Sequence, residues 1–299
     1  MKTIIDENEL FKHRFIAAGK HPKPHFIGYY HLLFDKLEHL DLVIYMKSFT
    51  KDFLKKYEGN IICLAPHYSR KLAYPWRKYR TILISHGPLP MSCRASTAIK
   101  ADHVISNGSD ELVRSIDFTR VGHHCMAGYF PTAYALPKRC EKTALVQITG
   151  KYECRFLPAQ VCRLLLERNY RVHVYNHLLY KSNFSGLPKE VKRVQSGLDY
   201  IHTLSSCSHY IFSGTSGFIT NMYTPGACMI ALSRDWCERN TPLFQHVLRN
   251  SCYFAQDENE LLTCLDAPPN YDEEMISFLY GRDRTNVIEK INEYLKGLS

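Results

Sequence analysis

The 299-residue sequence has no apolar run approaching the roughly 18 residues that a membrane-spanning helix needs. Its first twenty residues include Asp6, Glu7 and Glu9, so they lack the uninterrupted apolar stretch of a secretory signal peptide. Together these absences predict a cytoplasmic protein. Any contact with a membrane is expected to be peripheral, on the inner face.

The sequence also lacks a Cys-x-x-Cys pair, although it contains 11 cysteines. Many of them stand in apolar stretches such as 61–64, which predicts free thiols in the core rather than disulfides or a zinc ribbon. His123, His124 and Cys125 are residue types that bind metals. However, adjacent side chains on a strand point to opposite faces, and no second cluster has a matching spacing. We therefore expect no metal.

Acidic residues are in the minority, because 29 Asp and Glu stand against 38 Lys and Arg and leave a net charge of +9. The bases gather in two clusters: Arg70, Lys71, Arg77, Lys78 and Arg80, and Lys189, Lys192 and Arg193. Such an excess favours an anionic partner. A phosphorylated substrate, an anionic membrane surface and nucleic acid all stay open, as does a basic face that is merely solvated.

Short apolar runs alternate with segments of helical periodicity, as in parallel sheets covered by helices on both faces. The expected strands are 3–5, 41–45, 60–65, 81–85 and 103–106, followed by 143–149, 171–175, 209–213, 228–232 and 252–254. Helices are expected at 158–168 and, as one or two closing helices, within 272–298. Repeated strand–helix–strand units predict an α/β fold.

A break between the two series of strands lies near 131–142, where prolines and charged residues cluster. We therefore predict two Rossmann-like domains that face a central cleft. The N-terminal domain is expected over residues 1–137 and the C-terminal domain over 138–280. A closing C-terminal helix is expected over 281–299.

A glycine- and hydroxyl-rich loop follows one apolar run. Its sequence is Ile211-Phe212-Ser213-Gly214-Thr215-Ser216-Gly217-Phe218. A strand, a turn of small residues and a helix start together form an anion-binding arrangement of free backbone N–H groups, which predicts a phosphate site. No Gly-Lys-Ser/Thr follows as in a Walker loop, and an ordinary strand-to-helix turn is the alternative.

A second loop, which begins with His86 and Gly87, directly follows an expected strand. Ligands of parallel α/β sheets bind at the carboxyl ends of the strands. A histidine held there by stiff Gly-Pro backbone is a candidate catalytic base, because its pKa lies near neutrality. A structural histidine bonded to the loop backbone is the alternative.

Two more strand ends carry polar residues. Gly150 and Lys151 follow the strand at 143–149, where a glycine turn with a nearby lysine can meet a pyrophosphate. His177 follows the strand at 171–175. Their shared placement after strands predicts one common cleft.

These motifs resemble the GT-B class of nucleotide-sugar glycosyltransferases, near the bacterial CDP-glycerol glycerophosphotransferases and capsule polymerases. The resemblance covers residues 80–235 and rests on five stretches: His86-Gly87, Ala101-Asp102-His103-Val104-Ile105-Ser106 before the expected helix at 110–116, Met126-Ala127-Gly128-Tyr129, Asn176-His177, and 213–226. It implies an inverting, metal-independent transfer of a sugar from a nucleotide diphosphate donor, in cell-surface polysaccharide biosynthesis. The nucleotide-sugar would be a substrate, and no cofactor is implied.

The resemblance also implies roles for single residues. The N-terminal domain would bind the acceptor and supply His86 as the base, and the C-terminal domain would bind the donor. The donor phosphates would contact His177, Ser213, Thr215 and Ser216. From their place in the strand-end loops, Gly87, Gly150, Lys151, Gly214 and Gly217 are further candidate phosphate contacts. Asp235 is the candidate contact to sugar or ribose.

The first eighty residues match no motif, so the acceptor is defined only as an anionic or glycan molecule with a hydroxyl. His21, His25 and Arg70 are candidate contacts to it. Tyr74 and Trp76 lie in an aromatic stretch interleaved with bases that could stack on sugars or on nucleobases, or form a packing edge.

One departure from the family's motifs bears on the choice between a sugar donor and CDP-glycerol. Glycerophosphotransferases usually have an Asp before the serine pair, whereas Ser213 and Gly214 stand there in this chain, which favours a sugar donor. The alternatives are a CDP-glycerol-type glycerophosphotransferase or other polymer phosphotransferase, a nucleic-acid-modifying or nucleic-acid-binding protein, and a scaffold without activity.

Overall fold

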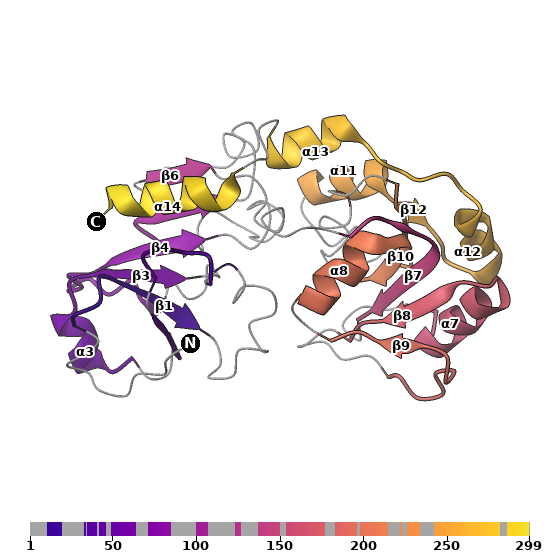
Figure 1. Ribbon diagram of the computed structural model, residues 1–299, viewed down its shortest axis with the longest axis horizontal. Coiled ribbons are helices and arrows are strands. Elements are labelled where there is room, and N and C mark those ends of the chain that lie inside the picture. Colours follow the sequence, from indigo (N-terminus) through magenta and orange to yellow (C-terminus); the bar gives the residue numbers. More distant parts are fainter. Residues whose placement is uncertain are drawn as a thin grey trace. The chain divides into compact units, whose positions relative to one another are not determined.

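The computed structural model describes sixteen stretches of the chain: residues 11–19, 33, 35–40, 42–45, 49–63, 71–84, 100–106, 123–126, 137–149, 154–176, 183–195, 198–214, 222, 226–233, 242–281 and 286–298. Contacts divide the chain into two compact units. The first contains Met1–Tyr134 and Ser277–Ser299, and the second contains Ala135–Ile276. Each unit holds one parallel sheet (Figure 1).

The sheet of the first unit has the strand order β2-β1-β3-β4-β5-β6, and every described pair is parallel. Its strands are β1 (Phe15–Gly19), β2 (Leu42–Tyr45), β3 (Asn60–Cys63), β4 (Arg80–Ile84), β5 (His103–Ser106) and β6 (His123–Met126). The order of the first five is that of flavodoxin-like doubly wound sheets. Apart from the exposed Arg80, the residues of β3 and β4 are almost fully buried, as expected of strands covered on both faces.

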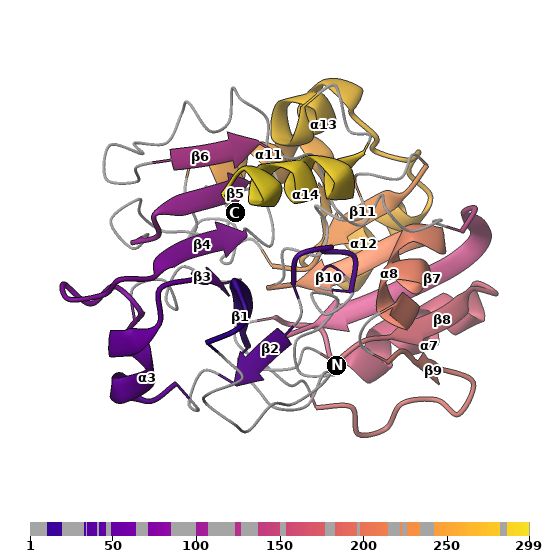
Figure 2. The same ribbon diagram turned by 60° about the vertical axis from the view of Figure 1, so that its left-hand side comes forward.

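The described part of the first unit contains the helices α3 (Lys51–Lys56) and α14 (Val287–Gly297). Helix α14 returns from the end of the chain to cover the first sheet (Figure 2). Its residues Val287, Ile291 and Leu295 share one core cluster with strand residues such as Ile82. Asn292 fastens the same helix to the segment before β2, because its Oδ1 accepts from the backbone N–H of Glu38 at 3.0 Å.

The sheet of the second unit has the order β12-β11-β10-β7-β8-β9, again with every pair parallel. Its strands are β7 (Cys140–Ile148), β8 (Arg171–Val174), β9 (Lys192–Arg193), β10 (Cys207–Ser213), β11 (Cys228–Ala231) and β12 (Tyr253–Phe254). Numbered along this unit, the order is 3-2-1-4-5-6, which is the Rossmann order. The order reverses between β7 and β10.

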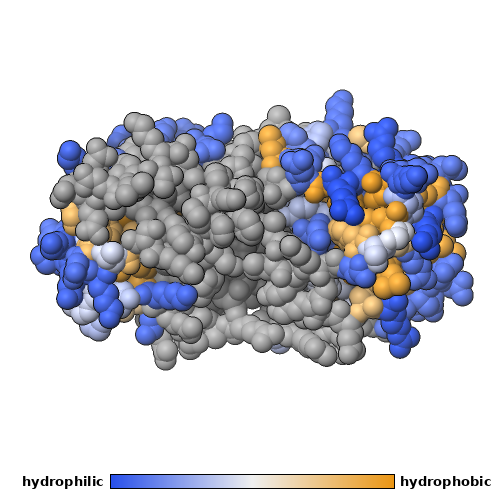
Figure 3. Space-filling model, turned by 90° about the horizontal axis from the view of Figure 1, so that it is seen from below, coloured by the Kyte–Doolittle hydropathy of each residue, from blue (hydrophilic) through white to orange (hydrophobic). Residues whose placement is uncertain are grey.

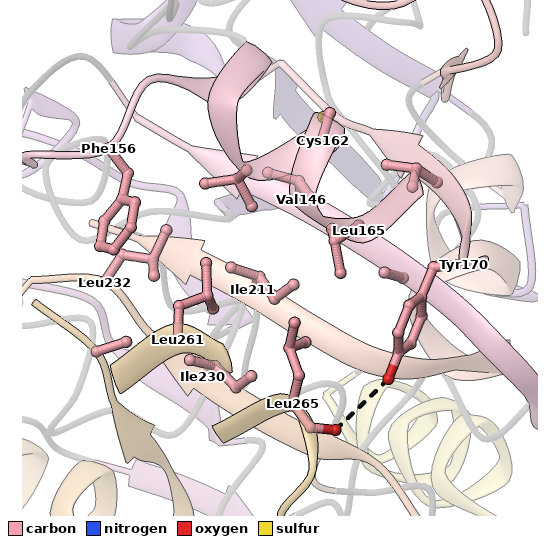
Figure 4. Packing of buried hydrophobic residues seen from close by; sticks show 14 of the residues in the cluster. Val146, Phe156, Cys162, Leu165, Tyr170, Ile211, Ile230, Leu232, Leu261 and Leu265 are labelled. Atoms are coloured by element: carbon pink, nitrogen blue, oxygen red, sulfur yellow. Dashed lines mark hydrogen bonds between the residues drawn. The ribbon is translucent and has the colours of Figure 1, made fainter. Parts of the chain in front are cut away.

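The second unit contains the described helices α7 (Pro158–Glu167), α8 (Leu198–Ser206), α11 (Pro242–Ser251) and α12 (Glu258–Leu265). Helix α13 (Glu273–Tyr280) spans the junction with the first unit in the sequence. The face that α7 and α12 cover contains Val146, Ile211 and Ile230 from three neighbouring strands (Figure 4). Leu165 and Leu261 pack on them from the two helices. Each such fully buried side chain contributes about 1.5 to 3 kcal/mol.

The predicted α/β class is confirmed, and each predicted strand that lies within the described residues is present. The expected strand at 3–5 lies outside them. The helix predicted at 158–168 is α7, and the closing segment forms α13 and α14.

Three strands were not predicted, for local reasons. Strand β1 contains two alanines and a glycine, β6 begins with two histidines, and β9 has only two residues, both basic. Their pairing with neighbouring strands overrides weak local propensity. Strand β7 also begins earlier than predicted, at Cys140, because this charged end of the strand pairs with Cys207 of β10.

The eight cysteines whose side chains are described have free thiols, and six of them are buried, which agrees with the predicted core thiols. Hydrophilic side chains cover much of the described surface seen from below, with apolar residues visible between them (Figure 3). Within the described residues, none of the helices is long and apolar enough to cross a bilayer.

We predict that Gly59→Ala destabilises the first unit by about 1 to 3 kcal/mol, because the new methyl group overpacks its surroundings. A Cβ at Gly59 would lie 2.6 Å from Cζ of Tyr57 and 2.8 Å from the carbonyl oxygen of Arg14. The Tyr57 ring cannot yield easily, since its hydroxyl faces the carbonyl oxygens of His13 and Arg14 at 3.1 and 3.3 Å. Denaturant titration measures the change.

Gly297→Ala is the matched control for Gly59→Ala. No atom lies within 4 Å of a Cβ at Gly297, the last residue of α14. Alanine there should be neutral or stabilise by up to about 1 kcal/mol. Equal losses in the two variants would contradict the packing described at Gly59.

The stability of the second unit should fall as the pH drops below about 6.5, the ordinary pKa of histidine. Burial lowers the pKa of His209, and burial beside Lys192 and Arg171 lowers that of His173. The unfolded chain therefore binds more protons than the folded one below this pH. The free energy of unfolding then falls by at most about 1.4 kcal/mol per pH unit for each histidine. Unfolding curves at several pH values test this, and His209→Gln should flatten the dependence. An unchanged slope would contradict it.

Candidate functional site

The candidate site lies where the strand order of the second sheet reverses, at the carboxyl ends of β7 and β10. Ile148 of β7 pairs with Ser213 of β10, and the link continues past both strands. The backbone N–H of Thr149 donates to the carbonyl oxygen of Ser213 at 3.2 Å, and its hydroxyl lies 3.5 Å from the carbonyl oxygen of Gly214. The crevice at such a reversal is the usual ligand position of doubly wound sheets.

Gly214 directly follows β10 and has a backbone conformation that favours glycine. Its φ is +68°, in the left-handed region, where a side chain costs about 1 kcal/mol or more. The chain therefore leaves the strand abruptly after Ser213. A turn of this kind lets successive backbone N–H groups face an anion.

Ser213 contributes a buried hydroxyl to this point. The side chain is fully buried, and its Oγ has no hydrogen-bond partner among the described residues except the weak contact with the Cys154 thiol. A buried hydroxyl without a strong partner is rare and costs about 1 to 3 kcal/mol. This residue thus retains hydrogen-bonding capacity at the end of the strand.

Cys154 connects the segment that enters α7 with the end of β10. Its thiol lies 3.7 Å from the carbonyl oxygen of Leu232, which it can reach as a donor. Burial raises the pKa of the Cys154 thiol, and the contacts with the Phe156 backbone and the Ser213 hydroxyl offset part of this rise. The thiol therefore stays protonated at neutral pH, which excludes it as a thiolate nucleophile.

Helix α7 begins without a side-chain cap. Its N-cap residue is Leu157, whose side chain is 66% exposed and cannot accept from the first-turn amides, and Pro158 follows at the first helical position. Pro158 has no N–H, and the Gln160 N–H donates to the Leu157 carbonyl oxygen at 3.0 Å, so the first turn offers the Ala159 N–H and the positive end of the helix dipole. Together with the Ser213 hydroxyl, this makes the edge near β7 and β10 suited to an anion.

A buried network supports the same two strands from the α8 side of the sheet. Gln147 is 1% exposed, and its Oε1 accepts from the hydroxyls of Tyr200 at 2.8 Å and Tyr210 at 2.7 Å. The Tyr200 ring stacks on that of Tyr175, with centroids 4.1 Å apart. The network fixes β7, β10 and α8 relative to one another directly behind the candidate site.

The strand order also places the predicted loops. Strands β8, β7 and β10 are consecutive neighbours, so their carboxyl ends stand about 4.8 Å apart along one edge. These ends lead to His177, Gly150 and Thr215 respectively. The predicted loops of the second domain therefore start from one edge of one sheet.

Ser213 and Gly214 are the two predicted site residues that the structure describes, and it brings both beside Thr149. The other predicted site residues lie outside the described residues: His21, His25, Arg70, His86, Gly87, Gly150, Lys151, His177, Thr215, Ser216, Gly217 and Asp235. Their roles stay predictions. Among the described residues, no group of three His, Cys, Asp or Glu side chains is placed to hold a metal ion.

Four supporting residues were missed from the sequence. Gln147 carried a signal, because a lone amide within an apolar strand must find partners in the core. Its partners Tyr200 and Tyr210 could not be inferred, since tyrosines are as common at surfaces as in cores. Cys154 had no sequence signal.

No protein-family model matches the sequence, and none of the curated proteins compared with it matches either. Eleven chains of solved structures are similar, and three of them are described here. The glycosyltransferase SnogD from Streptomyces nogalater has a TM-score of 0.54 at 12% identity, covering 95% of this chain and 98% of its own. Alr3699/HepE of Anabaena, in complex with UDP-glucose, has a TM-score of 0.44 at 9% identity, covering 95% and 98%.

The spinosyn forosaminyltransferase SpnP has a TM-score of 0.42 at 15% identity, covering 83% of this chain and 78% of its own. Of the three, only the likeness to SnogD is close enough to show a shared fold. The chain therefore has the fold of a glycosyltransferase with two Rossmann-like domains, and the predicted GT-B-like fold class is confirmed.

We predict that Gly214→Ala lowers the affinity for a nucleoside diphosphate. A side chain at φ +68° forces the turn after Ser213 to change or strains it by about 1 to 2 kcal/mol. Calorimetric titration of UDP, GDP and CDP measures the affinity, and denaturant titration measures the stability.

Gly186→Ala provides the matched control. Gly186 lies in the same unit with φ +72°, and a Cβ there would meet only the Arg163 side chain at 3.7 Å. This variant should lose a similar amount of stability and keep its nucleotide affinity. Equal nucleotide binding by both variants would place the ligand away from Gly214.

Proposed function

We propose that this protein is a glycosyltransferase that moves a sugar from a nucleotide diphosphate donor to a hydroxyl acceptor. The observation that carries the proposal is the anion-suited strand reversal in a Rossmann-ordered sheet, with Ser213, Gly214 and Thr149 at its centre. The fold shared with the glycosyltransferase SnogD supports it. A nucleotide at such a reversal follows the general rule for these sheets.

The donor diphosphate would lie over the ends of β7 and β10. The Ser213 hydroxyl would donate to a phosphate oxygen and gain the strong partner that it lacks among the described residues. The amides after Gly214 and the first turn of α7 would add N–H donors, and Lys151 a positive charge. His177 and the hydroxyls of Thr215 and Ser216 would complete the contacts from neighbouring loops.

The proposed reaction is a single displacement at the anomeric carbon. The acceptor oxygen forms a bond to the anomeric carbon while the bond from that carbon to the diphosphate oxygen breaks, so the configuration inverts. His86, two residues after the end of β4, takes the acceptor proton. The loop amides and Lys151 stabilise the negative charge of the departing diphosphate, so no metal is required.

The identity of the donor separates this proposal from its nearest alternative. A CDP-glycerol-type glycerophosphotransferase would use the same edge of the sheet, but the sequence has no Asp before the Ser213 loop. We favour a sugar donor for this reason. The same family resemblance suggests a role in cell-surface polysaccharide synthesis. His21, His25 and Arg70 would then contact an anionic or glycan acceptor.

A thermal-shift screen of nucleotides and nucleotide-sugars tests the donor class. A ligand present at 100 times its dissociation constant stabilises the folded protein by about 2.7 kcal/mol, so a true donor should raise the melting temperature clearly. We expect a UDP-, GDP- or dTDP-sugar to do so. A shift with CDP-glycerol and CMP alone would replace the sugar donor by glycerol phosphate, and no shift with any nucleotide would reject catalysis.

The His86→Ala variant tests the mechanism. Loss of a general base should slow transfer by about 10² to 10⁴-fold while the donor-induced thermal shift stays the same. His246→Ala is the control, since His246 is exposed on α11 and its ring approaches only Asn250 of the same helix among described partners. Substantial turnover in His86→Ala would remove His86 from the mechanism.

A further inference from the structure

The segment that leads into β4 contains a closed tight turn. The backbone N–H of Arg77 donates to the carbonyl oxygen of Tyr74 at 3.2 Å, which closes a four-residue turn. Pro75 and Trp76 occupy its two central positions, and proline at the first of these fixes the backbone in advance. The turn thus presents Tyr74 and Trp76 on a stiff backbone.

Both ends of this turn are fastened to the first unit. The carbonyl oxygen of Leu72 accepts from the backbone N–H of Tyr74 at 2.9 Å and from the hydroxyl of Tyr79 at 2.7 Å. Leu72 and Tyr79 are themselves 3% and 2% exposed. On the other side, the guanidinium of Arg77 is paired with the carboxylate of Asp102. The position of the turn is therefore set by buried groups.

The two aromatic rings of the turn form a stacked pair at the surface. Their centroids lie 4.6 Å apart, and the ring planes differ by 15°. Trp76 is 40% exposed although Tyr74 lies against one of its faces. The indole is thus held in one orientation with much of its surface in water, so a ligand that stacks on it loses little side-chain entropy.

Two of the bases near this pair are neutralised by carboxylates. Arg77 is paired with Asp102, and Nζ of Lys78 lies 2.8 Å from the Glu58 carboxylate, whereas Lys71 and Arg80 keep their charges. A nucleic acid or a sulfated chain would have to break both ion pairs to use Arg77 and Lys78. The apolar C–H face of a pyranose instead matches the negative face of an aromatic ring.

The turn lies at the opposite end of β4 from the expected catalytic loop. It precedes Arg80, the first residue of the strand, whereas His86 follows Ile84, the last. At about 3.3 Å per residue, the first and last residues of the five-residue strand lie roughly 13 Å apart. In Figure 2 the turn belongs to the segment at the tail of the β4 arrow.

We propose that the Tyr74–Trp76 pair is a glycan-binding platform, separate from the reaction site, that holds a distant sugar of a neutral oligosaccharide or polysaccharide. The assignment of the acceptor as a neutral glycan rests on the proposed glycosyltransferase function. The binding itself depends only on the stacked pair.

Intrinsic fluorescence can report on this platform directly, since the chain has 2 tryptophans, Trp76 and Trp236. The Trp236→Phe variant leaves Trp76 as the only indole. It is titrated with neutral hexasaccharides of glucose, mannose, xylose and N-acetylglucosamine, and with a heparin hexasaccharide and an oligothymidylate. We expect at least one neutral hexasaccharide to change the Trp76 emission saturably, with an affinity that is alike at about 50 and about 500 mM salt, and no change with the anionic ligands.

Calorimetry with the same hexasaccharide then compares Trp76→Ala and Tyr74→Ala with Phe11→Ala. Phe11 is a matched control, because it is 39% exposed and its ring packs on that of Phe53 with centroids 5.3 Å apart. The Trp76 and Tyr74 variants should lose about tenfold or more in affinity, and the Phe11 variant should bind as the parent does. Thermal unfolding confirms that each variant is folded.

Three outcomes would overturn the proposal: no neutral glycan changes the Trp76 emission, the heparin fragment or oligothymidylate does so with strong salt dependence, or Phe11→Ala loses as much affinity as Trp76→Ala. Nucleotide binding is titrated on the same preparation. Glycan binding without nucleotide binding would reject the proposed function alone, and nucleotide binding without glycan binding would reject the platform alone.

Discussion

The pairing of β7 with β10 is the constraint on which the candidate site depends. These strands are far apart in the sequence, and their parallel pairing reverses the strand order of the second sheet. The bond from the Thr149 amide to the Ser213 carbonyl carries the pairing to the last residue of β10. The left-handed Gly214 comes next in the chain, and a turn of this kind at the strand reversal is suited to an anion.

Buried groups on both faces of the sheet hold this pairing in place. The core with α7 and α12 packs Val146 and Ile211 from the two strands side by side, and non-directional burial of this kind supplies most of the stabilising free energy. On the opposite face, Gln147 adds directional hydrogen bonds, because its side-chain oxygen accepts from two tyrosine hydroxyls. A shift in register would leave the amide unsatisfied, so the network favours one alignment of the strands that carry the site.

The sequence was sufficient for the fold class because periodicity and burial coincide in strands such as β3, β4 and β10. It was insufficient for β9, since two basic residues carry no strand signal and pair only because β8 offers them an edge. For the site, Ser213 and Gly214 were identifiable from residue type and from their place after an apolar run. The contact of Cys154 and the bonds of Tyr200 depend on tertiary packing, which spacing along the chain does not encode.

Hydrogen–deuterium exchange with and without a nucleoside diphosphate tests the central claim most directly, namely that the donor diphosphate lies over the ends of β7 and β10. The account predicts slower exchange in peptides that contain residues 149–160 and 213–220, because their amides bind phosphate oxygens. Peptides over the first-unit turn at 74–77 should exchange at an unchanged rate. Protection that spares both second-unit segments and falls elsewhere would contradict the account.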